Sequence, residues 1–364
     1  MWKIGILILI LASIATIITF YKNLQKENNP SPTLTLTNSP KPFSKTALET
    51  SKTEVVTRNL EIPWALAFLP DRSMLVTERA GRVRLISGEG ILQDKPIATI
   101  NVKQSGESGL HGLAIHPKYP EQPYVYLYYT YSSNNDNSLN RVSRFNFDGQ
   151  TLTDEKVIVD KIPGAVFHDG GRIKFGPDGF LYITTGDAQN PSLSQDKNSL
   201  AGKILRVKDE GKVEMYSYGH RNPQGIAWDD KGNLWATEHG QSAQDEINKI
   251  QTGRNYGWPT IRGDEKKDGL ESPVLHSGSQ TWAPAGAAFF NGSIYFGGLR
   301  GQALFEYNIE TKSLKEHLKG QFGRIRDVVL GPDNMLYITT SNRDGRGSPS
   351  ADDDRVIRIN PDKL

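Results

Sequence analysis

A short phrase that recurs along the chain constrains the fold more than any other feature of the sequence. Each copy places a Pro-Asp, Asp-Gly or Asn-Gly turn before a short strand of alternating apolar and polar residues. The clear copies are FLPDRSMLVTER, FGPDGFLYITTGD, WDDKGNLWATEHG and LGPDNMLYITTSN, and the weaker ones are IHPKYPEQPYVYLYYTY and FFNGSIYFGGL. Such turns favour hairpins because Gly tolerates a positive φ. The β-branched and aromatic residues of period two that flank them favour strands.

The spacing of these copies predicts the architecture. They recur at intervals of roughly 40–60 residues, which suits a four-stranded propeller blade better than a short solenoid repeat. No segment after Val55 carries a long helical period, and the terminal DDRVIRINP is expected to pair with an early strand and close a ring. Six copies therefore predict an all-β, six-bladed β-propeller, with a generic β-sandwich as the alternative.

The N-terminal residues predict export. An unbroken run of apolar and small residues extends from Ile4 to Phe20 between two lysines. Its length is near the lower limit for a membrane span and near the upper limit for a signal-peptide core. We expect residues 1–22 to form a hydrophobic signal peptide or a retained membrane-anchor helix, which would place the protein outside the cytoplasm, in the periplasm or at the cell surface.

The next segment has a different composition. Residues 23–54 are rich in Pro, Ser, Thr and Asn, with few large apolar side chains. Such a segment cannot bury enough surface to offset the entropy lost on ordering. We expect a disordered linker there, followed by a catalytic propeller domain over residues 55–364.

Composition excludes several classes of function. Lys plus Arg total 43 against 41 Asp plus Glu, so the balance gives no reason to expect a nucleic-acid partner. The chain has no cysteine, which excludes disulfides, zinc thiolates and cysteine nucleophiles. The oligomeric state is left open.

Polar residues near the repeats suggest a site. Ligands of propellers bind at the mouth of the central channel, where strand starts and inter-blade loops meet. The ionisable and amide residues at such positions are Glu107, His168, Asp187, Arg221, Asn222, Gln224, His239, Asp245, Glu246, Arg300, Arg324 and Arg326. Converging arginines suit a polyanion. A histidine beside a carboxylate is the usual arrangement of a general base, and carboxylates with exposed carbonyls suit calcium.

Each of these residues also has a purely structural interpretation. Asp187 follows Thr-Thr-Gly and could simply close a turn, while His168 could be a loop histidine with satisfied hydrogen bonds. Arg324 and Arg326 alternate on a strand and could both face solvent. The recurrence of such residues at one position per blade is what favours a site.

The longer motifs resemble a known family. They are IPWALAFLPDRSMLVTER, HDGGRIKFGPDGFLYITTGD, YSYGHRNPQGIAWD, ATEHG…DEINKI…GRNYGWP and RIRDVVLGPDNMLYITT. In order and spacing they are similar to the soluble pyrroloquinoline-quinone (PQQ) dependent glucose and aldose sugar dehydrogenases. The resemblance covers about Val55 to Asn360. It is closer to the broad-specificity aldose branch, because long inserted loops are missing.

The resemblance implies a function and a set of roles. It implies oxidation of aldose sugars at the anomeric carbon to lactones, with hydride transfer to PQQ and electrons passed to an external acceptor. His168 matches the base, Asp187 the carboxylate that orients it, and Arg221 the residue that stabilises negative charge on the quinone. The cofactor contacts implied are Glu107, Arg221, Asn222, Gln224, His239, Arg300, Arg324 and Arg326.

The resemblance also implies calcium. One ion would be held by the backbone carbonyls of Gly240 and Gln241, and a second, structural ion by Glu246 and the Tyr256 carbonyl. Gln241 stands where the family often has proline, which leaves a backbone ligand intact.

Two further departures concern charge. Arg300 stands where glucose-specific members have lysine. The change replaces a compact ammonium with a planar guanidinium that can form paired hydrogen bonds. Asp169 follows the base directly, where a neutral residue is more usual. If its carboxylate faced His168, it would raise the pKa of that imidazole.

Two other functions remain open at this stage. A calcium-dependent lactonase on a six-bladed propeller would need side-chain carboxylates and Asn at the channel, but not four arginines. A non-catalytic binding propeller would be expected to have lost His168 or several arginines. The preferred sugar and the physiological electron acceptor are not predicted.

Overall fold

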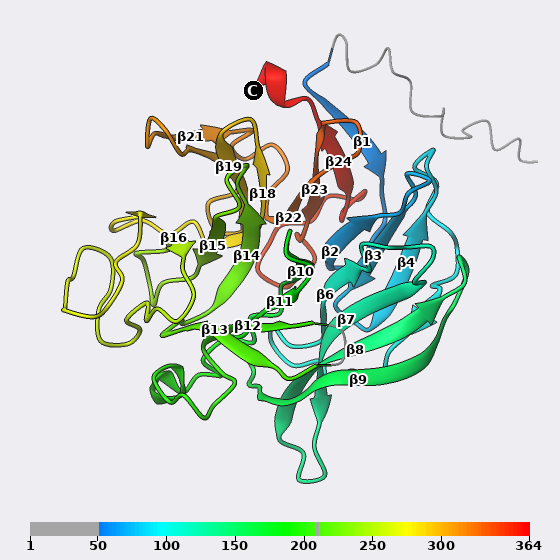
Figure 1. Cartoon of the computed structure of the whole chain (residues 1–364). Coiled ribbons are helices and arrows are strands. Elements are labelled where there is room, and N and C mark those ends of the chain that lie inside the picture. The colour runs from blue at the N-terminus through cyan, green and yellow to red at the C-terminus, as the bar shows by residue number, and fades with distance from the viewer. Residues whose placement is uncertain (1–50, 209–210) are drawn as a thin grey trace, which may run out of the picture. The chain divides into compact units, whose positions relative to one another are not determined.

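Six antiparallel sheets of four strands each make up the computed structural model (Figure 1), which describes residues 51–208 and 211–364. The first three sheets hold β2 Pro63–Phe68, β3 Met74–Glu78, β4 Arg82–Ile86, β5 Ala98–Thr99; β6 Leu110–Ile115, β7 Tyr124–Ser132, β8 Ser138–Phe147, β9 Leu152–Pro163; and β10 Ile173–Phe175, β11 Leu181–Thr184, β12 Lys203–Val207, β13 Glu214–Tyr218. The next two hold β14 Pro223–Trp228, β15 Leu234–Glu238, β16 Glu246–Ile250, β17 Leu275–His276; and β18 Pro284–Phe290, β19 Ser293–Gly298, β20 Leu304–Asn308, β21 Leu314–His317. The predicted all-β, six-bladed propeller is confirmed.

The sixth blade closes the ring with strands from both ends of the domain. It combines β22 Ile325–Leu330, β23 Leu336–Thr340 and β24 Val356–Ile359 with β1 Thr53–Thr57, in the order β1-β24-β23-β22. The pairing of β1 with β24 confirms the predicted closure by the terminal strand. Because Thr53 pairs with Ile359, the propeller begins at Thr53 rather than at Val55.

The repeated phrase is the turn between the first and second strands of a blade. In four blades the turn aspartate accepts a hydrogen bond of 3.0–3.2 Å from the backbone N–H two residues further on; these are Asp71, Asp178, Asp229 and Asp333. This arrangement is an Asx turn. The other oxygen of Asp178 accepts from the Tyr182 hydroxyl, and that of Asp229 accepts from the Trp235 indole. The turn is thereby tied to the strand that comes after it, which explains why the phrase recurs.

The innermost strands carry β-bulges that reorient single side chains. The pairing of β2 with β3 passes from Pro63 directly to Ala65, so Trp64 is left outside the register. In the same way Gln224 is skipped in β14 and Arg326 in β22. A bulge turns its extra residue away from the ladder, and bulges are frequent beside active sites.

Apolar side chains between neighbouring blades form the core. One cluster joins the first two blades and includes Trp64, Leu75, Val83, Leu110, Val125 and Leu127, all nearly inaccessible to solvent. Burying each such side chain stabilises the fold by about 1.5–3 kcal/mol. Apart from the strands, only two short 3₁₀ segments, Pro191–Ser194 and Pro361–Lys363, are present among the described residues.

The N-terminal expectations are not addressed by this structure. The predicted signal or anchor at 1–22, and the predicted linker as far as residue 50, lie outside the described residues. Within the described part of the chain, no helix has the length and apolar character needed to cross a membrane.

Candidate active site

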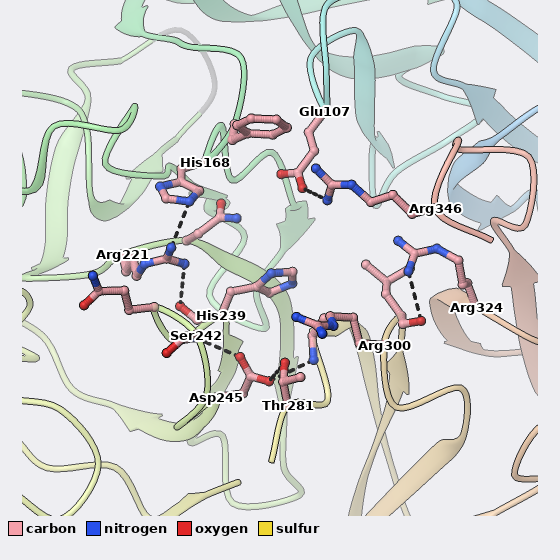
Figure 2. Close-up of a pocket in the computed structure, with 16 residues that line it drawn as sticks. Glu107, His168, Arg221, His239, Ser242, Asp245, Thr281, Arg300, Arg324 and Arg346 are labelled. Atoms are coloured by element: carbon pink, nitrogen blue, oxygen red, sulfur yellow. Dashed lines mark hydrogen bonds and ion pairs between the residues drawn. The ribbon is translucent and has the colours of Figure 1, made fainter. Parts of the chain in front are cut away.

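A cavity of about 390 Å³ brings together most of the residues that the sequence singled out (Figure 2). Its lining includes the predicted Glu107, His168, Arg221, Asn222, His239, Gly240, Gln241, Arg300 and Arg324. Glu107, His168 and Arg221 each lie shortly before the innermost strand of a different blade, β6, β10 and β14. The loops that enter the innermost strands therefore supply much of the site, as expected.

Two local backbone features place the histidine. His168 itself has a φ of +67°, an unusual conformation for a residue with a side chain. The carbonyl of His168 passes so close to Gly186 that a Cβ there would lie 1.8 Å from its oxygen. The glycine of the Thr-Thr-Gly-Asp sequence is therefore required by the close approach of the His168 loop. The strand end that carries Asp187 can then lie directly beside the imidazole.

The His168 ring is hydrogen-bonded at both nitrogens. Its Nδ1 lies 2.8 Å from Oδ1 of Asp187, and its Nε2 lies 2.9 Å from Nη2 of Arg221. Arginine can only donate, so Nε2 accepts and the proton resides on Nδ1. The imidazole is thus held as the tautomer whose lone pair is on Nε2, the form required of a general base.

Asp187 is almost completely buried, and both of its carboxylate oxygens accept hydrogen bonds. Besides the His168 ring, its Oδ1 accepts from the backbone N–H of Gln189 at 2.9 Å. Its Oδ2 accepts from the indole Nε1 of Trp258, also at 2.9 Å. The contact between Asp187 and His168 expected from the sequence is present, whereas the contribution of Trp258 was not anticipated.

Arg221 is held in place by Glu238, which the sequence analysis missed together with its partner His220, and by the predicted His239. Its backbone N–H donates to the Glu238 carboxylate, which also accepts from Nδ1 of His220 at 2.8 Å. The guanidinium donates to the His239 carbonyl at 3.2 Å. Burial lowers the pKa of Arg221, and the nearby carboxylates of Asp187 and Glu238 oppose that shift.

The cavity has an excess of positive charge. Four arginines line it against two carboxylates, those of Glu107 and Asp245. Arg324 is paired with Asp344 at 2.7 Å, and Arg346 with Glu107 at 2.6 Å. Among the described residues, the exposed Arg300 has no side-chain partner. The lining therefore suits an anionic ligand.

Arg346 was also missed by the sequence analysis. It lies in SNRDGRG, six residues after the end of β23, the second strand of the sixth blade. This position is outside the repeated phrase LGPDNMLYITTSN, so the repeat alone could not have identified Arg346.

Three buried polar atoms at the cavity lack a hydrogen-bond partner among the described residues. They are Nε of Arg221, Nδ2 of Asn222 and Nε2 of His239. An unsatisfied buried polar group costs about 1–3 kcal/mol, so these atoms indicate that a ligand completes the site. Burial lowers the pKa of His239 to about 4, which keeps its ring neutral at physiological pH.

Gln224 and Arg326 are hydrogen-bonded to each other next to the cavity. Neither lines the cavity; instead Nη1 of Arg326 donates to Oε1 of Gln224 at 2.6 Å. The Arg326 guanidinium also lies 5.8 Å from the Trp64 ring, so the bulge residues gather in one place. Burial lowers the pKa of Arg326 to about 10. Nε of Arg326 is buried without a hydrogen-bond partner among the described residues, and the roles of Gln224 and Arg326 as cofactor contacts stay predictions.

The carboxylate of Asp169 is hydrogen-bonded to groups other than His168. Its carboxylate accepts from Asn140 at 2.9 Å, from the Ala165 N–H at 3.0 Å and from Ser108 at 3.1 Å. Burial raises the pKa of Asp169 to about 6. These bonds tie the loop before β10 to the second blade, so the condition that Asp169 faces His168 is not met.

A small second cavity of about 20 Å³ adjoins the first. Gly240, Gln241, Glu246 and Tyr256, the predicted calcium ligands, all line it. Burial and the neighbouring Glu238 raise the pKa of Glu246 to about 8. Over residues 51–208 and 211–364, no three His, Asp or Glu side chains are grouped to hold a metal ion. The calcium assignments therefore stay predictions.

Comparison with known proteins points to one family. The profile described as Glucose / Sorbosone dehydrogenase matches residues 60–348. Aldose sugar dehydrogenase YliI of Escherichia coli K12 is 31% identical over 342 residues, which cover 81% of this chain and 91% of that protein. Quinoprotein glucose dehydrogenase B of Acinetobacter calcoaceticus is 30% identical over 271 residues, covering 63% of this chain and 57% of that protein.

A solved structure agrees with these matches. The PQQ-bound form of aldose sugar dehydrogenase from Streptomyces coelicolor has a TM-score of 0.79 and 37% sequence identity to this chain. The match covers 84% of this chain and 97% of that one. The likeness therefore extends over nearly all of the propeller.

Proposed function

The chain belongs to the glucose/sorbosone dehydrogenase family, and from that premise we propose that it is a PQQ-dependent aldose sugar dehydrogenase. It would oxidise aldoses at the anomeric carbon to lactones and pass the electrons to an external acceptor. The observation that carries this proposal is the His168 ring, held by Asp187 with its Nε2 lone pair at the wall of a cationic cavity.

The residues present fit PQQ. Its carboxylates would find guanidinium groups on Arg300, Arg324 and Arg346, of which Arg300 is without a side-chain partner among the described residues. The unsatisfied N–H groups of Arg221 and Asn222 suit the acceptor atoms of a quinone. When bound, PQQ would supply a hydride acceptor, which no side chain of this protein can be.

The protein's own contribution would be proton transfer and charge stabilisation. Nε2 of His168 would take the proton of the anomeric hydroxyl as the C–H electron pair leaves that carbon, so a carbonyl forms while the O–H and C–H bonds break. The buried carboxylate of Asp187 would stabilise the imidazolium that results. Nη2 of Arg221 donates to Nε2 in this structure, so a substrate hydroxyl would take the place of this contact.

The support for calcium comes from the immediate surroundings of the second cavity. Gly240 and Gln241 line both cavities, so the two residues whose carbonyls the family resemblance implies as ligands lie at the site. The half-buried Glu246 lies beside Glu238, and a cation there would relieve the repulsion between the two carboxylates. We include Ca²⁺ in the proposal on these grounds, with Glu246 and the Tyr256 carbonyl at the second ion.

The alternatives are less well supported. A calcium-dependent lactonase needs carboxylate ligands gathered at the channel, and no such group occurs in the part of the chain that the structure describes. A binding propeller has no need of a tautomerically fixed histidine with a buried carboxylate behind it. The apolar run at Ile4 to Phe20 supports a location outside the cytoplasm, which we propose on sequence grounds alone.

One assay distinguishes these functions. Purified protein is supplied with PQQ and Ca²⁺, and reduction of an artificial dye is followed with glucose, xylose or maltose as substrate. Reduction that requires PQQ supports the dehydrogenase, and His168→Ala should abolish it. Lactone hydrolysis without PQQ, or the absence of both activities in folded protein, would contradict the proposal.

A further inference from the structure

Trp258 joins two of the proposed catalytic residues. Its indole Nε1 donates to Oδ2 of Asp187 at 2.9 Å, and its ring lies 5.4 Å from the guanidinium carbon of Arg221. A second guanidinium, that of Arg262, lies 5.3 Å from the same ring. Trp258 is only 8% exposed. It does not line the main cavity, so it acts on the reaction only through its neighbours.

The backbone around Trp258 is firmly held. Its N–H donates to the Gly219 carbonyl at 2.9 Å, and its carbonyl accepts from the Gln195 side chain at 2.6 Å. Two residues earlier, the Tyr256 ring stacks on His220 at 4.8 Å. These contacts attach the loop between β16 and β17 to the segment that leads into Arg221. The indole is therefore a donor fixed in position.

This donor determines how the Asp187 carboxylate is oriented. Oδ1 has two partners, His168 and the Gln189 N–H, whereas the indole is the partner of Oδ2 among the described residues. A carboxylate bonded at one oxygen can rotate about its terminal bond, and rotation would tilt the imidazole that it holds. A buried hydrogen bond at each oxygen removes that freedom.

We propose that Trp258 is a positioning residue, which fixes the Asp187 carboxylate and thereby the orientation of His168 and the geometry of its Nδ1–H hydrogen bond. This role rests on the proposed function, because it matters for turnover only if His168 is the base. The geometric part of the proposal can be tested without any cofactor.

The experiment compares two isosteric changes in the full-length protein. Trp258→Phe keeps an aromatic ring and removes the indole N–H. Trp235→Phe is the matched control, because Trp235 is also buried and its Nε1 donates to a carboxylate, that of Asp229, at 3.0 Å in a blade turn. Both variants lose one indole-to-carboxylate hydrogen bond, so both should show a similar loss of thermal stability.

The two variants should differ in the state of His168. In cofactor-free protein, ¹H–¹⁵N spectra of the imidazoles should show a strongly hydrogen-bonded, downfield Nδ1–H of His168 in wild type and Trp235→Phe, and in Trp258→Phe this proton should shift upfield or be lost to exchange with water. With PQQ and sugar, Trp258→Phe should lower kcat by about 10- to 100-fold with little change in KM, since small misplacements of a reacting group are costly. Trp235→Phe should keep the wild-type kcat.

Specific outcomes would overturn the proposal. Unchanged His168 spectra in a folded Trp258→Phe protein would do so, whatever the activity. If Trp258→Phe does not fold, Asp187→Asn tests the same hydrogen bond between Trp258 and Asp187 by changing its acceptor. The indole N–H resonance of Trp258 should move when the carboxylate is lost, and an unmoved resonance would contradict the contact. Inactive wild type with the expected spectra would instead contradict the proposed function alone.

Discussion

Replacing Asp187 with asparagine should separate the electrostatic role of this residue from its structural role. The side chains have the same shape, and the site offers donors to both positions from Trp258 and Gln189. Asparagine carries no charge, however, so it cannot stabilise the imidazolium that forms when His168 takes a proton. Its amide can also present an N–H to the ring and favour the other tautomer.

The size of the effect can be worked out from the geometry. The Nδ1–Oδ1 distance is 2.8 Å, which places the two charge centres about 4 Å apart. At that separation and an effective dielectric constant of about 20, the attraction is about 4 kcal/mol. Each factor of ten in rate corresponds to about 1.4 kcal/mol. We therefore expect Asp187→Asn to lower kcat/KM for glucose by about 1,000-fold.

The assay is dye reduction at saturating PQQ, with cofactor binding measured separately by thermal shift. Asp229→Asn is a suitable control, because that carboxylate also accepts an indole N–H but lies in a blade turn. The control should lose stability and keep its activity. A decrease in kcat/KM of less than tenfold in folded, PQQ-loaded Asp187→Asn would refute the reasoning. It would show that the charge of the carboxylate does not stabilise the protonated His168.

Three further predictions concern the backbone, the cofactor and pH. Gly186→Ala should lower the melting temperature and the activity together, because its Cβ would lie 1.8 Å from the His168 carbonyl oxygen; a destabilisation below about 1 kcal/mol in denaturant unfolding would contradict this. Arg300→Ala should weaken PQQ binding by about tenfold or more in a titration of cofactor-free protein, and unchanged affinity would remove this residue from the cofactor site. The folded-state pKa of Glu246 is raised to about 8, so the unfolded chain releases this proton at lower pH and the stability of calcium-free protein should fall as pH rises from about 4.5 to 8. Glu246→Gln should flatten that slope and raise the melting temperature at pH 8.5 more than at pH 5, and equal effects at both pH values would contradict the assignment.

The repeated turn made the fold predictable from local chemistry. An aspartate that accepts the N–H two residues on, with a strand of period two directly after it, is encoded within about a dozen residues, as at Asp178 and Tyr182. The residues that enter each innermost strand could be located from the same phrase. This is why His168 and Arg221 could be selected without a structure.

Other parts of the site depend on distant contacts and carry no local signal. Arg346 reaches Glu107 across 239 residues of sequence, and the two meet only because the ring closes. Trp258 reaches Asp187 from a loop that has no counterpart in the repeats. The bulges that reorient Gln224 and Arg326 arise from strand register, which alternation alone did not show.

The central claim is that the arginine-lined cavity binds PQQ and that His168 then removes the sugar's proton. The most direct measurement is the absorption spectrum of cofactor-free protein titrated with PQQ in the presence of Ca²⁺, with glucose added afterwards. We predict a saturable spectral change on binding for both wild type and His168→Ala, and rapid reduction by glucose in the wild type only. No spectral change on adding PQQ to folded wild-type protein, or equally rapid reduction in His168→Ala, would contradict it.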